Sequence, residues 1–151
     1  MATRAQVVAE AREWIGTRWD HQHCMKGRGC DCIGLVKGVA LALGLYAPET
    51  SSTALAQQFA GYGKAPAAGE LERGLRLFAA PIDREKADIG DVVLMRVRGA
   101  PRHVGILGDY PLGGFSLIHA ALVPRKVVEQ RLDDAWTASV VGYYRLPGVT
   151  L

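Results

Sequence analysis

The stretch Gly29-Cys30-Asp31-Cys32-Ile33-Gly34-Leu35-Val36 marks the point where an irregular segment gives way to an apolar helix. Apolar residues recur at helical spacing, which predicts a helix that begins at Asp31 and Cys32 and ends at Leu43. Gly44 follows as a C-terminal cap. Because the apolar coverage of this segment is wide, we expect the helix to lie buried at the centre of the fold.

The sequence before this stretch divides into a helix and a loop. Thr3–Ile15 has apolar residues on one face, a capping box formed by Thr3 and Gln6, and Gly16 as a stop signal. Thr17–Gly29 shows no hydrophobic period, and it gathers histidine, cysteine and basic residues in a few positions. We therefore expect an amphipathic helix and then a loop with unusual side-chain chemistry.

After this stretch the sequence pattern changes from one typical of helices to one typical of strands. Shorter helices are predicted over Thr50–Gly61 and Gly69–Ala79. Short runs rich in Val, Ile, Leu and Tyr, bounded by turn residues, then predict antiparallel strands over Val92–Val97, His103–Leu107, Phe115–Ala121, Lys126–Glu129 and Ser139–Leu146. Helices first and strands second indicate an α+β fold, with the helices packed on one face of the sheet.

Length and composition narrow the class of protein. A chain of 151 residues suits one domain, residues 1–151, and 49% hydrophobic with 22% charged residues is typical of a globular protein. The formal charge of +3 is scattered, so we expect no nucleic-acid partner. We expect neither a secretory signal nor membrane insertion, since no apolar segment of either kind occurs, and we expect synthesis in the cytoplasm.

Three cysteines leave at least one thiol unpaired within the chain, and Cys32 is the candidate of most interest. At a helix N-terminus the macrodipole and free N–H groups favour a thiolate, which predicts a pKa lower than usual. The same N–H groups can stabilise an oxyanion. The alternative is a small buried hydrophobic residue, and a nucleophile also requires a base.

Two histidines in the strand half supply candidate bases. His103 and His119 each share a strand face with small or apolar residues, a setting that also fits ordinary core histidines. If their strands pair as a hairpin through the turn Asp109–Gly114, the two rings come within reach of each other. One ring could then take the proton of Cys32 while the other orients it, as acyl transfer requires.

Four motifs in this order resemble the NlpC family of bacterial papain-like cysteine peptidases: Asp31-Cys32-Ile33-Gly34-Leu35-Val36, Gly90-Asp91-Val92-Val93-Leu94, His103-Val104-Gly105-Ile106 and Ile118-His119-Ala120. The resemblance extends from about Trp14 to Tyr144. It implies a papain-like fold with about five or six strands and hydrolysis of peptidoglycan stem peptides, typically between D-glutamate and the diamino acid. It further implies Cys32 as nucleophile, His103 as general base and His119 as the residue that orients the base.

The resemblance also suggests residues that bind substrate. The family commonly carries a tyrosine before the nucleophile, where Gly16-Thr17-Arg18-Trp19 offers Trp19 as a wall without the phenolic hydroxyl. Ile33 follows the nucleophile in place of the usual serine. We expect His21 and Gln22 to line the cleft, with Gln22 a possible oxyanion donor, and Asp31 to contact substrate.

The loop before the nucleophile is similar to that of one branch of the family, the small peptidases encoded among phage tail and gene transfer agent genes. The features shared with that branch are His21, Gln22, Cys24 and the Cys30-Asp31-Cys32 string. The implied partners are tail or hub proteins. A phage-like particle would carry the enzyme to the periplasm and cell wall, which agrees with the expected lack of a secretory signal.

Other interpretations stay open. His21, His23, Cys24 and Cys30 could supply zinc ligands, Cys24 and Cys30 could form a disulfide, or all four could be plain loop residues, and no metal or cofactor is expected. The protein could instead be a non-catalytic tail or wall-binding module that attaches through Arg18, Lys26 and Arg28. The same three catalytic groups could also transfer an acyl group to an amine rather than to water.

Overall fold

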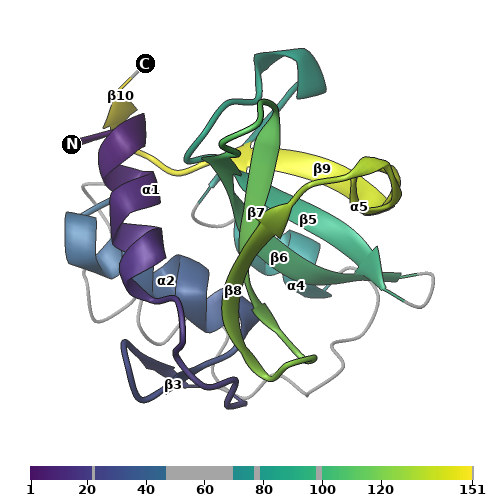
Figure 1. The fold of residues 1–151 in the computed structure, drawn as a ribbon. Coiled ribbons are helices and arrows are strands. Elements are labelled where there is room, and N and C mark those ends of the chain that lie inside the picture. The colour runs from purple at the N-terminus through teal and green to yellow at the C-terminus, as the bar shows by residue number, and fades with distance from the viewer. Residues whose placement is uncertain (22, 47–69, 77–78, 98–99, 151) are drawn as a thin grey trace.

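The structure is a computed structural model that describes residues 1–21, 23–46, 70–76, 79–97 and 100–150. Two N-terminal helices, α1 (Arg4–Glu13) and α2 (Cys32–Leu43), lie side by side against one face of an antiparallel sheet (Figure 1). The predicted α+β fold is therefore confirmed. No helix within the described ranges is long and apolar enough to cross a bilayer.

Helix α1 begins where the capping box predicts. Gln6 N donates to Thr3 Oγ1 at 3.1 Å and Thr3 N donates to Gln6 Oε1 at 2.8 Å. Such a cap stabilises a helix by about 1 kcal/mol. The helix ends at Glu13 with Trp14 as its C-cap, two residues before the predicted end at Ile15, and Gly16 follows with φ of 92°.

Helix α2 has the predicted bounds. Asp31 is its N-cap, and Gly44 ends it in the left-handed conformation, with φ of 66°. Two glycines allow other segments to come close: a side chain at Gly38 would collide with the Trp14 ring, and one at Gly34 would collide with the carbonyl oxygen of His23. The first turn of α2 is thus held directly against the loop that precedes it.

The main sheet has six strands in the order β4-β9-β5-β6-β7-β8, and all neighbours are antiparallel. The strands are β4 (Ala80–Ile82), β5 (Val92–Val97), β6 (Ala100–Asp109), β7 (Phe115–Ala121), β8 (Lys126–Arg131) and β9 (Val140–Arg145). All five predicted strands are present. The largest difference is at β6, which extends beyond the predicted His103–Leu107 at both ends.

Shorter elements complete the described chain. Helix α4 (Glu70–Arg76) lies inside the predicted helix Gly69–Ala79, whereas the predicted helix Thr50–Gly61 lies outside the described residues. The sequence does not predict the remaining elements, which are the hairpin of β2 (Cys24–Met25) and β3 (Gly29–Cys30), the 3-10 helix η1 (Arg84–Lys86), helix α5 (Asp134–Ser139), and the parallel pair of β1 (Ala2–Thr3) and β10 (Val149–Thr150).

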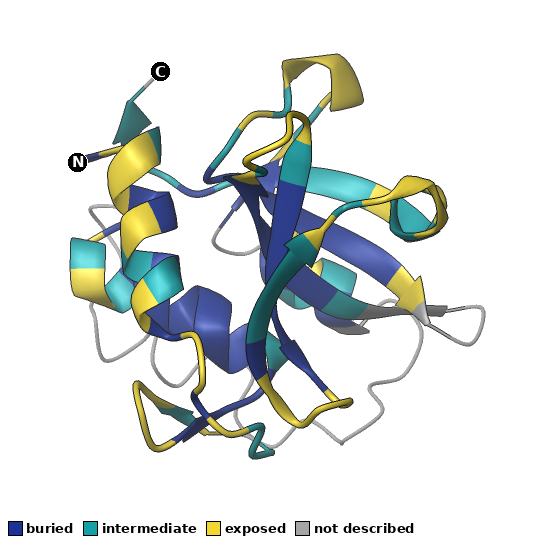
Figure 2. Ribbon diagram, in the orientation of Figure 1, coloured by how far each residue is buried: buried dark blue, intermediate teal, exposed yellow. Residues whose placement is uncertain are grey.

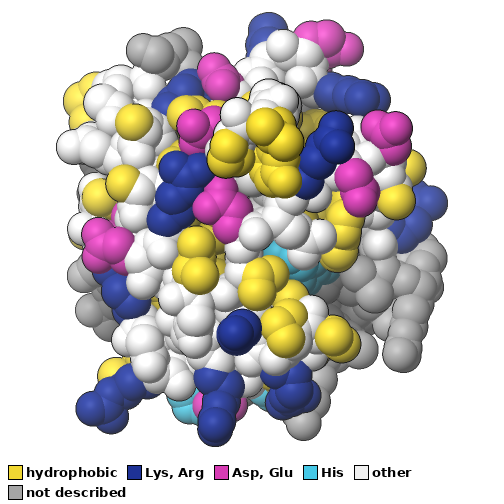
Figure 3. All heavy atoms as spheres, in the orientation of Figure 1, with side chains coloured by type: hydrophobic (Ala, Val, Ile, Leu, Met, Phe, Trp, Pro, Cys, Tyr) yellow, Lys and Arg dark blue, Asp and Glu magenta, His cyan; other side chains and the backbone are white. Residues whose placement is uncertain are grey.

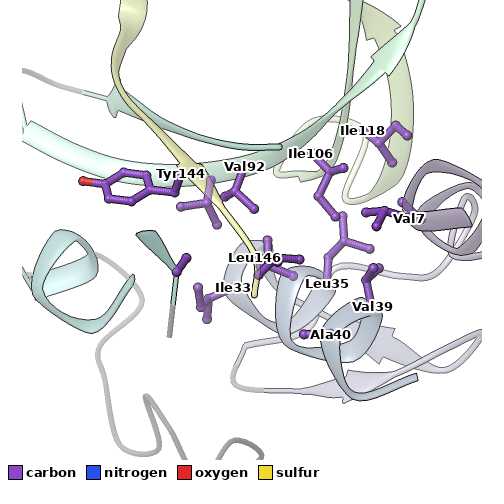
Figure 4. Close-up of a cluster of buried hydrophobic side chains, with 14 of the residues drawn as sticks. Val7, Ile33, Leu35, Val39, Ala40, Val92, Ile106, Ile118, Tyr144 and Leu146 are labelled. Atoms are coloured by element: carbon purple, nitrogen blue, oxygen red, sulfur yellow. The ribbon is translucent and has the colours of Figure 1, made fainter. Parts of the chain in front are cut away.

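The larger core lies between the two N-terminal helices and the sheet. Side chains of α1 and α2 meet those of β5, β6 and β7, as Figure 4 shows for Leu35, Ile106 and Ile118, and Figure 2 shows buried residues along both surfaces. Each fully buried aliphatic side chain contributes about 1.5–3 kcal/mol. A smaller cluster on the opposite face of the sheet contains Val93, Met95, Leu107 and Leu117 and is covered partly by α5.

The Gly90-Asp91 motif has a structural role. Asp91 is fully buried, and its carboxylate accepts hydrogen bonds from Arg145 at 3.0 and 2.9 Å and forms an ion pair with Arg4 at 3.2 Å. Asp88 N also donates to Asp91 Oδ2 at 2.9 Å. Since a buried charge requires such partners, Asp91 connects α1, the start of β5 and β9.

Candidate active site

Cys32 is the first residue of α2 and is half-buried. Burial raises the pKa of its thiol most and the Asp31 carboxylate raises it further, while the N–H groups of Val104, Ile33 and Cys32 lower it, which leaves the pKa at about 12. The prediction of a lowered pKa at Cys32 is therefore wrong. The helix N-terminus acts in the predicted direction, but desolvation and a neighbouring negative charge outweigh it.

The two predicted histidines are in direct contact. His103 on β6 and His119 on β7 belong to a hairpin connected by residues 110–114, and His103 Nε2 lies 2.7 Å from His119 Nδ1. The rings are nearly perpendicular, with centroids 5.0 Å apart. The prediction that these strands pair and bring the rings within reach is confirmed.

Both histidines are neutral at pH 7. The pKa of His103 is lowered to about 3, mainly by burial and to a smaller extent by the neighbouring His119. Burial also lowers the pKa of His119, although its hydrogen bond to Gln130 acts in the opposite direction. A neutral imidazole has one nitrogen that can accept a proton, as a general base must.

The backbone of β6 reaches the thiol one residue after His103. Val104, which follows His103, directs its N–H toward the sulfur of Cys32. Within the described part of the chain no hydrogen bond joins the Cys32 thiol to the His103 ring. Catalytic hydrogen bonds are often long in the absence of substrate, so this geometry is compatible with proton transfer from thiol to ring.

A pocket of about 250 Å³ adjoins the histidine pair, and it is lined by His103, His119, Ala121, Leu122, Val123, Gln130 and Trp136. Trp136 on α5 packs against both histidine rings, with centroid distances of 6.5 Å to His103 and 5.3 Å to His119. Leu122 and Val123 are largely exposed at its rim. In Figure 3 histidine side chains are visible among hydrophobic ones on the face that carries β8.

Gln130 and Trp136 are absent from the predicted site. Gln130 lies on β8, and its Oε1 is 2.8 Å from His119 Nε2. Val128 is directly opposite His119 in the β7–β8 register, so alternation places Gln130 on the same face as His119. The predicted strand ends at Glu129, one residue before Gln130, so the alternation that places Gln130 beside His119 was not applied to it. Trp136 sits in a short helix that no sequence pattern indicated.

Three of the predicted substrate-binding residues cluster beside the nucleophile. The rings of Trp19 and His21 are stacked 6.4 Å apart, and His21 Nδ1 lies 4.0 Å from Asp31 Oδ2. Arg125 lies over the Trp19 ring at 5.3 Å. Asp31 is buried and its Oδ1 accepts a hydrogen bond from Gly34 N at 2.9 Å, so it caps α2. Gln22, the predicted oxyanion donor, lies outside the described residues.

The cysteines of the β2–β3 hairpin do not gather metal ligands. Across residues 1–21 and 23–46 and the other described segments, no group of three His, Cys, Asp or Glu side chains could hold an ion. His23 is exposed and its ring lies 3.2 Å from Asp20. Cys24 and Cys30 are directly opposite in the hairpin, and both are free thiols.

The basic loop of the binding-module interpretation is partly neutralised by ion pairs. Lys26 contacts Glu10 at 2.5 Å and Glu13 at 3.1 Å. Arg18 and Arg28 are exposed. The loop therefore offers less positive charge for attachment than its sequence indicates.

Comparisons with known proteins give the family of the chain and relatives of its fold. Residues 14–145 match the NlpC/P60 family. The NlpC/p60 domain of the peptidoglycan hydrolase SagA has 23% identity and a TM-score of 0.57 over 95% of this chain and 98% of that domain. An NlpC/P60 family protein from Bacillus cereus has 18% identity and a TM-score of 0.63, over 95% of this chain and 40% of its own.

An N-acetylmuramoyl-L-alanine amidase from Bacteroides uniformis has 12% identity and a TM-score of 0.62, over 95% of this chain and 98% of that chain. Among curated proteins, none matches this sequence. At these identities the solved structures establish a common fold, and the sequence match over residues 14–145 establishes common ancestry.

Proposed function

The chain belongs to the NlpC/P60 family, and on that premise we propose that it is a cysteine endopeptidase that hydrolyses peptidoglycan stem peptides, with Cys32, His103 and His119 as its catalytic residues. The observation that carries the proposal is the 2.7 Å contact between His103 on β6 and His119 on β7, together with the N–H of Val104, the residue after His103, which points to Cys32. The SagA domain, itself named as part of a peptidoglycan hydrolase, supports the substrate class.

The raised thiol pKa and the lowered histidine pKa values describe a resting site in which both groups are neutral. Substrate binding brings the carbonyl to the thiol, His103 takes the thiol proton, and the sulfur attacks the carbonyl carbon. The N–H groups at the start of α2 stabilise the oxyanion. His103 then gives its proton to the leaving amine, and water hydrolyses the acyl-enzyme.

The scissile bond in this proposal is that between D-glutamate and the diamino acid, as the motif resemblance implies. Trp19 and His21, stacked beside the nucleophile, would form one wall of the substrate groove. The apolar rim of Leu122 and Val123 would form another, beside the histidine pair. Leu122 and Val123 are exposed and Trp19 and His21 are partly exposed, so a peptide could reach both walls.

The decisive experiment is digestion of purified peptidoglycan, with mass spectrometry of the released fragments. We expect the wild-type chain to release stem-peptide fragments with a new amino group on the diamino acid, and Cys32→Ala to release none. Cys24→Ser is the matched control, because the hydroxyl introduced there can still donate to Gly34 O as the Cys24 thiol does. Equal release by Cys32→Ala would refute the proposal.

Two arms of the same experiment separate the rival functions. An added amine acceptor that appears in an amide product would indicate acyl transfer rather than hydrolysis. Binding to the sacculus by the wild-type chain without release of fragments would indicate a binding module.

We also propose that a phage-like tail delivers the enzyme to the periplasm and cell wall, through contacts with tail or hub proteins. The similarity of the Cys30-Asp31-Cys32 loop to the tail-associated branch supports this proposal. Immunodetection of the chain in purified tail particles from the producing cells would test it. Its presence only in the wall fraction, with none in particles, would contradict delivery by a tail.

A further inference from the structure

We propose that Gln130 is a positioning residue: its side-chain carbonyl selects the tautomers of His119 and His103 and thereby leaves His103 a free lone pair for the thiol proton. This inference rests on the proposed function, since it explains why His103 can act as a base. Gln130 belongs to β8, a strand that contributes none of the predicted catalytic residues.

The proton order, meaning which ring nitrogen of each histidine carries the hydrogen, follows from Gln130 to His119 and then to His103. Gln130 Oε1 can only accept, so His119 Nε2, 2.8 Å away, must carry the hydrogen. His119 is neutral, so its Nδ1 is then an acceptor, and His103 Nε2, 2.7 Å away, must donate to it. His103 is neutral as well, and its remaining nitrogen, Nδ1, has the unshared lone pair.

The opposite order would disable the base. If the amide nitrogen of Gln130 faced His119, it would donate to Nε2, and His119 Nδ1 would carry the hydrogen and donate to His103 Nε2. His103 would then hold its proton on Nδ1, the only ring nitrogen that His119 does not occupy. A ring in that tautomer cannot accept a proton from Cys32.

The position of Gln130 suits this role. It lies two residues beyond the direct partner of His119 on the neighbouring strand, which is the diagonal contact that long side chains reach across a sheet. Trp136 packs edge-on against the His119 ring and limits its rotation. The backbone of β8 pairs with β7 whatever the side chain at residue 130, so a substitution there changes the proton order more than the fold.

A neutral amide is also chemically distinct from a carboxylate at this position. Both accept the His119 hydrogen, but a carboxylate would add a negative charge beside two buried rings and stabilise the imidazolium form. Gln130 therefore fixes the tautomer while it keeps the pair uncharged.

The test is nitrogen NMR of the chain labelled with ¹⁵N-histidine, together with kinetics of Gln130→Leu and Gln130→Glu. In the wild-type chain we expect hydrogen on Nε2 of both His103 and His119. In Gln130→Leu we expect mixed tautomers and a loss of about ten- to hundredfold in kcat, by analogy with removal of the partner that orients a metal-binding histidine, with KM little changed. Thermal unfolding of each variant checks that it is folded.

Gln130→Glu gives an independent readout that a purely structural role would not produce. It should keep the Nε2–H tautomers and move the acid limb of the kcat/KM profile to higher pH, because the added charge favours protonation. Wild-type rings with hydrogen on Nδ1 would overturn the inference, and so would unchanged tautomers in Gln130→Leu. The tautomers are read without turnover, so a failure of Cys32→Ala to abolish hydrolysis would refute the function separately.

Discussion

The two faces of the main sheet are built on different principles. The face toward α1 and α2 is covered by aliphatic side chains such as Leu35, Ile106 and Ile118, which need only be apolar and of suitable volume. The opposite face holds the histidine pair beneath Trp136, where each ring depends on a particular hydrogen-bond partner. The first face stabilises the fold, and the second holds the two histidines that the proposed mechanism pairs with Cys32 at the start of α2.

Replacement of the proposed base, His103, should have the largest effect: hydrolysis should fall steeply while the free energy of unfolding hardly changes. In His103→Gln the amide N–H can still donate to His119 Nδ1, but the side chain cannot accept a thiol proton. We expect hydrolysis to fall by about a hundred- to ten-thousandfold, the range of general acid–base catalysis. Chemical denaturation should show a small change in the free energy of unfolding. A large loss of stability with residual activity near wild type would contradict this contrast.

A substitution in the helix-facing core should have the opposite effect: it should lower stability and leave activity unchanged. Leu35→Ala removes a fully buried side chain and should lower the free energy of unfolding by about 2–5 kcal/mol. Activity per folded molecule should stay near that of wild type at low temperature. Urea titration gives the free energy of unfolding, and the hydrolysis rate divided by the folded fraction from that titration gives the activity per folded molecule. If activity per folded molecule fell as far as in His103→Gln, the two faces would not be separable.

Acid provides the most graded test. The folded-state pKa of His103, about 3, lies below its ordinary value, so the unfolded chain binds a proton that the folded chain excludes. Stability attributable to this ring is present above about pH 6.5 and declines as pH falls toward 3, by at most about 1.4 kcal/mol per pH unit. His103→Gln should show a shallower decline between pH 6.5 and 4 than wild type. Equal slopes would show that the ring is not buried in its neutral form.

The helix-facing half of the molecule could be predicted closely because its signals are local. Thr3 with Gln6 gives the start of α1, and Gly44 gives the end of α2. The hairpin that joins His103 to His119 follows from two strands and one turn, since antiparallel pairing brings neighbouring strands together whatever else the chain does.

The site was only partly predictable because its chemistry depends on residues distant in sequence. The pKa of Cys32 is raised mainly by burial, which arises only once distant segments have packed around the thiol, and the charge of the adjacent Asp31 raises it further. Gln130 and Trp136 reach the histidines only after β8 and α5 have packed against them. Nothing in the local pattern around either residue specifies that contact.

The pairing of β1 with β10 has a practical consequence for engineering. Ala2 N donates to Gly148 O at 3.0 Å, so both ends of the described chain lie at one corner of the molecule (Figure 1). Helix α1, about 15 Å long, separates that corner from the loop that leads to Cys32. A carrier protein fused at either end, or a circular permutant that joins the two ends, would therefore leave the histidine pocket open to a polymeric substrate.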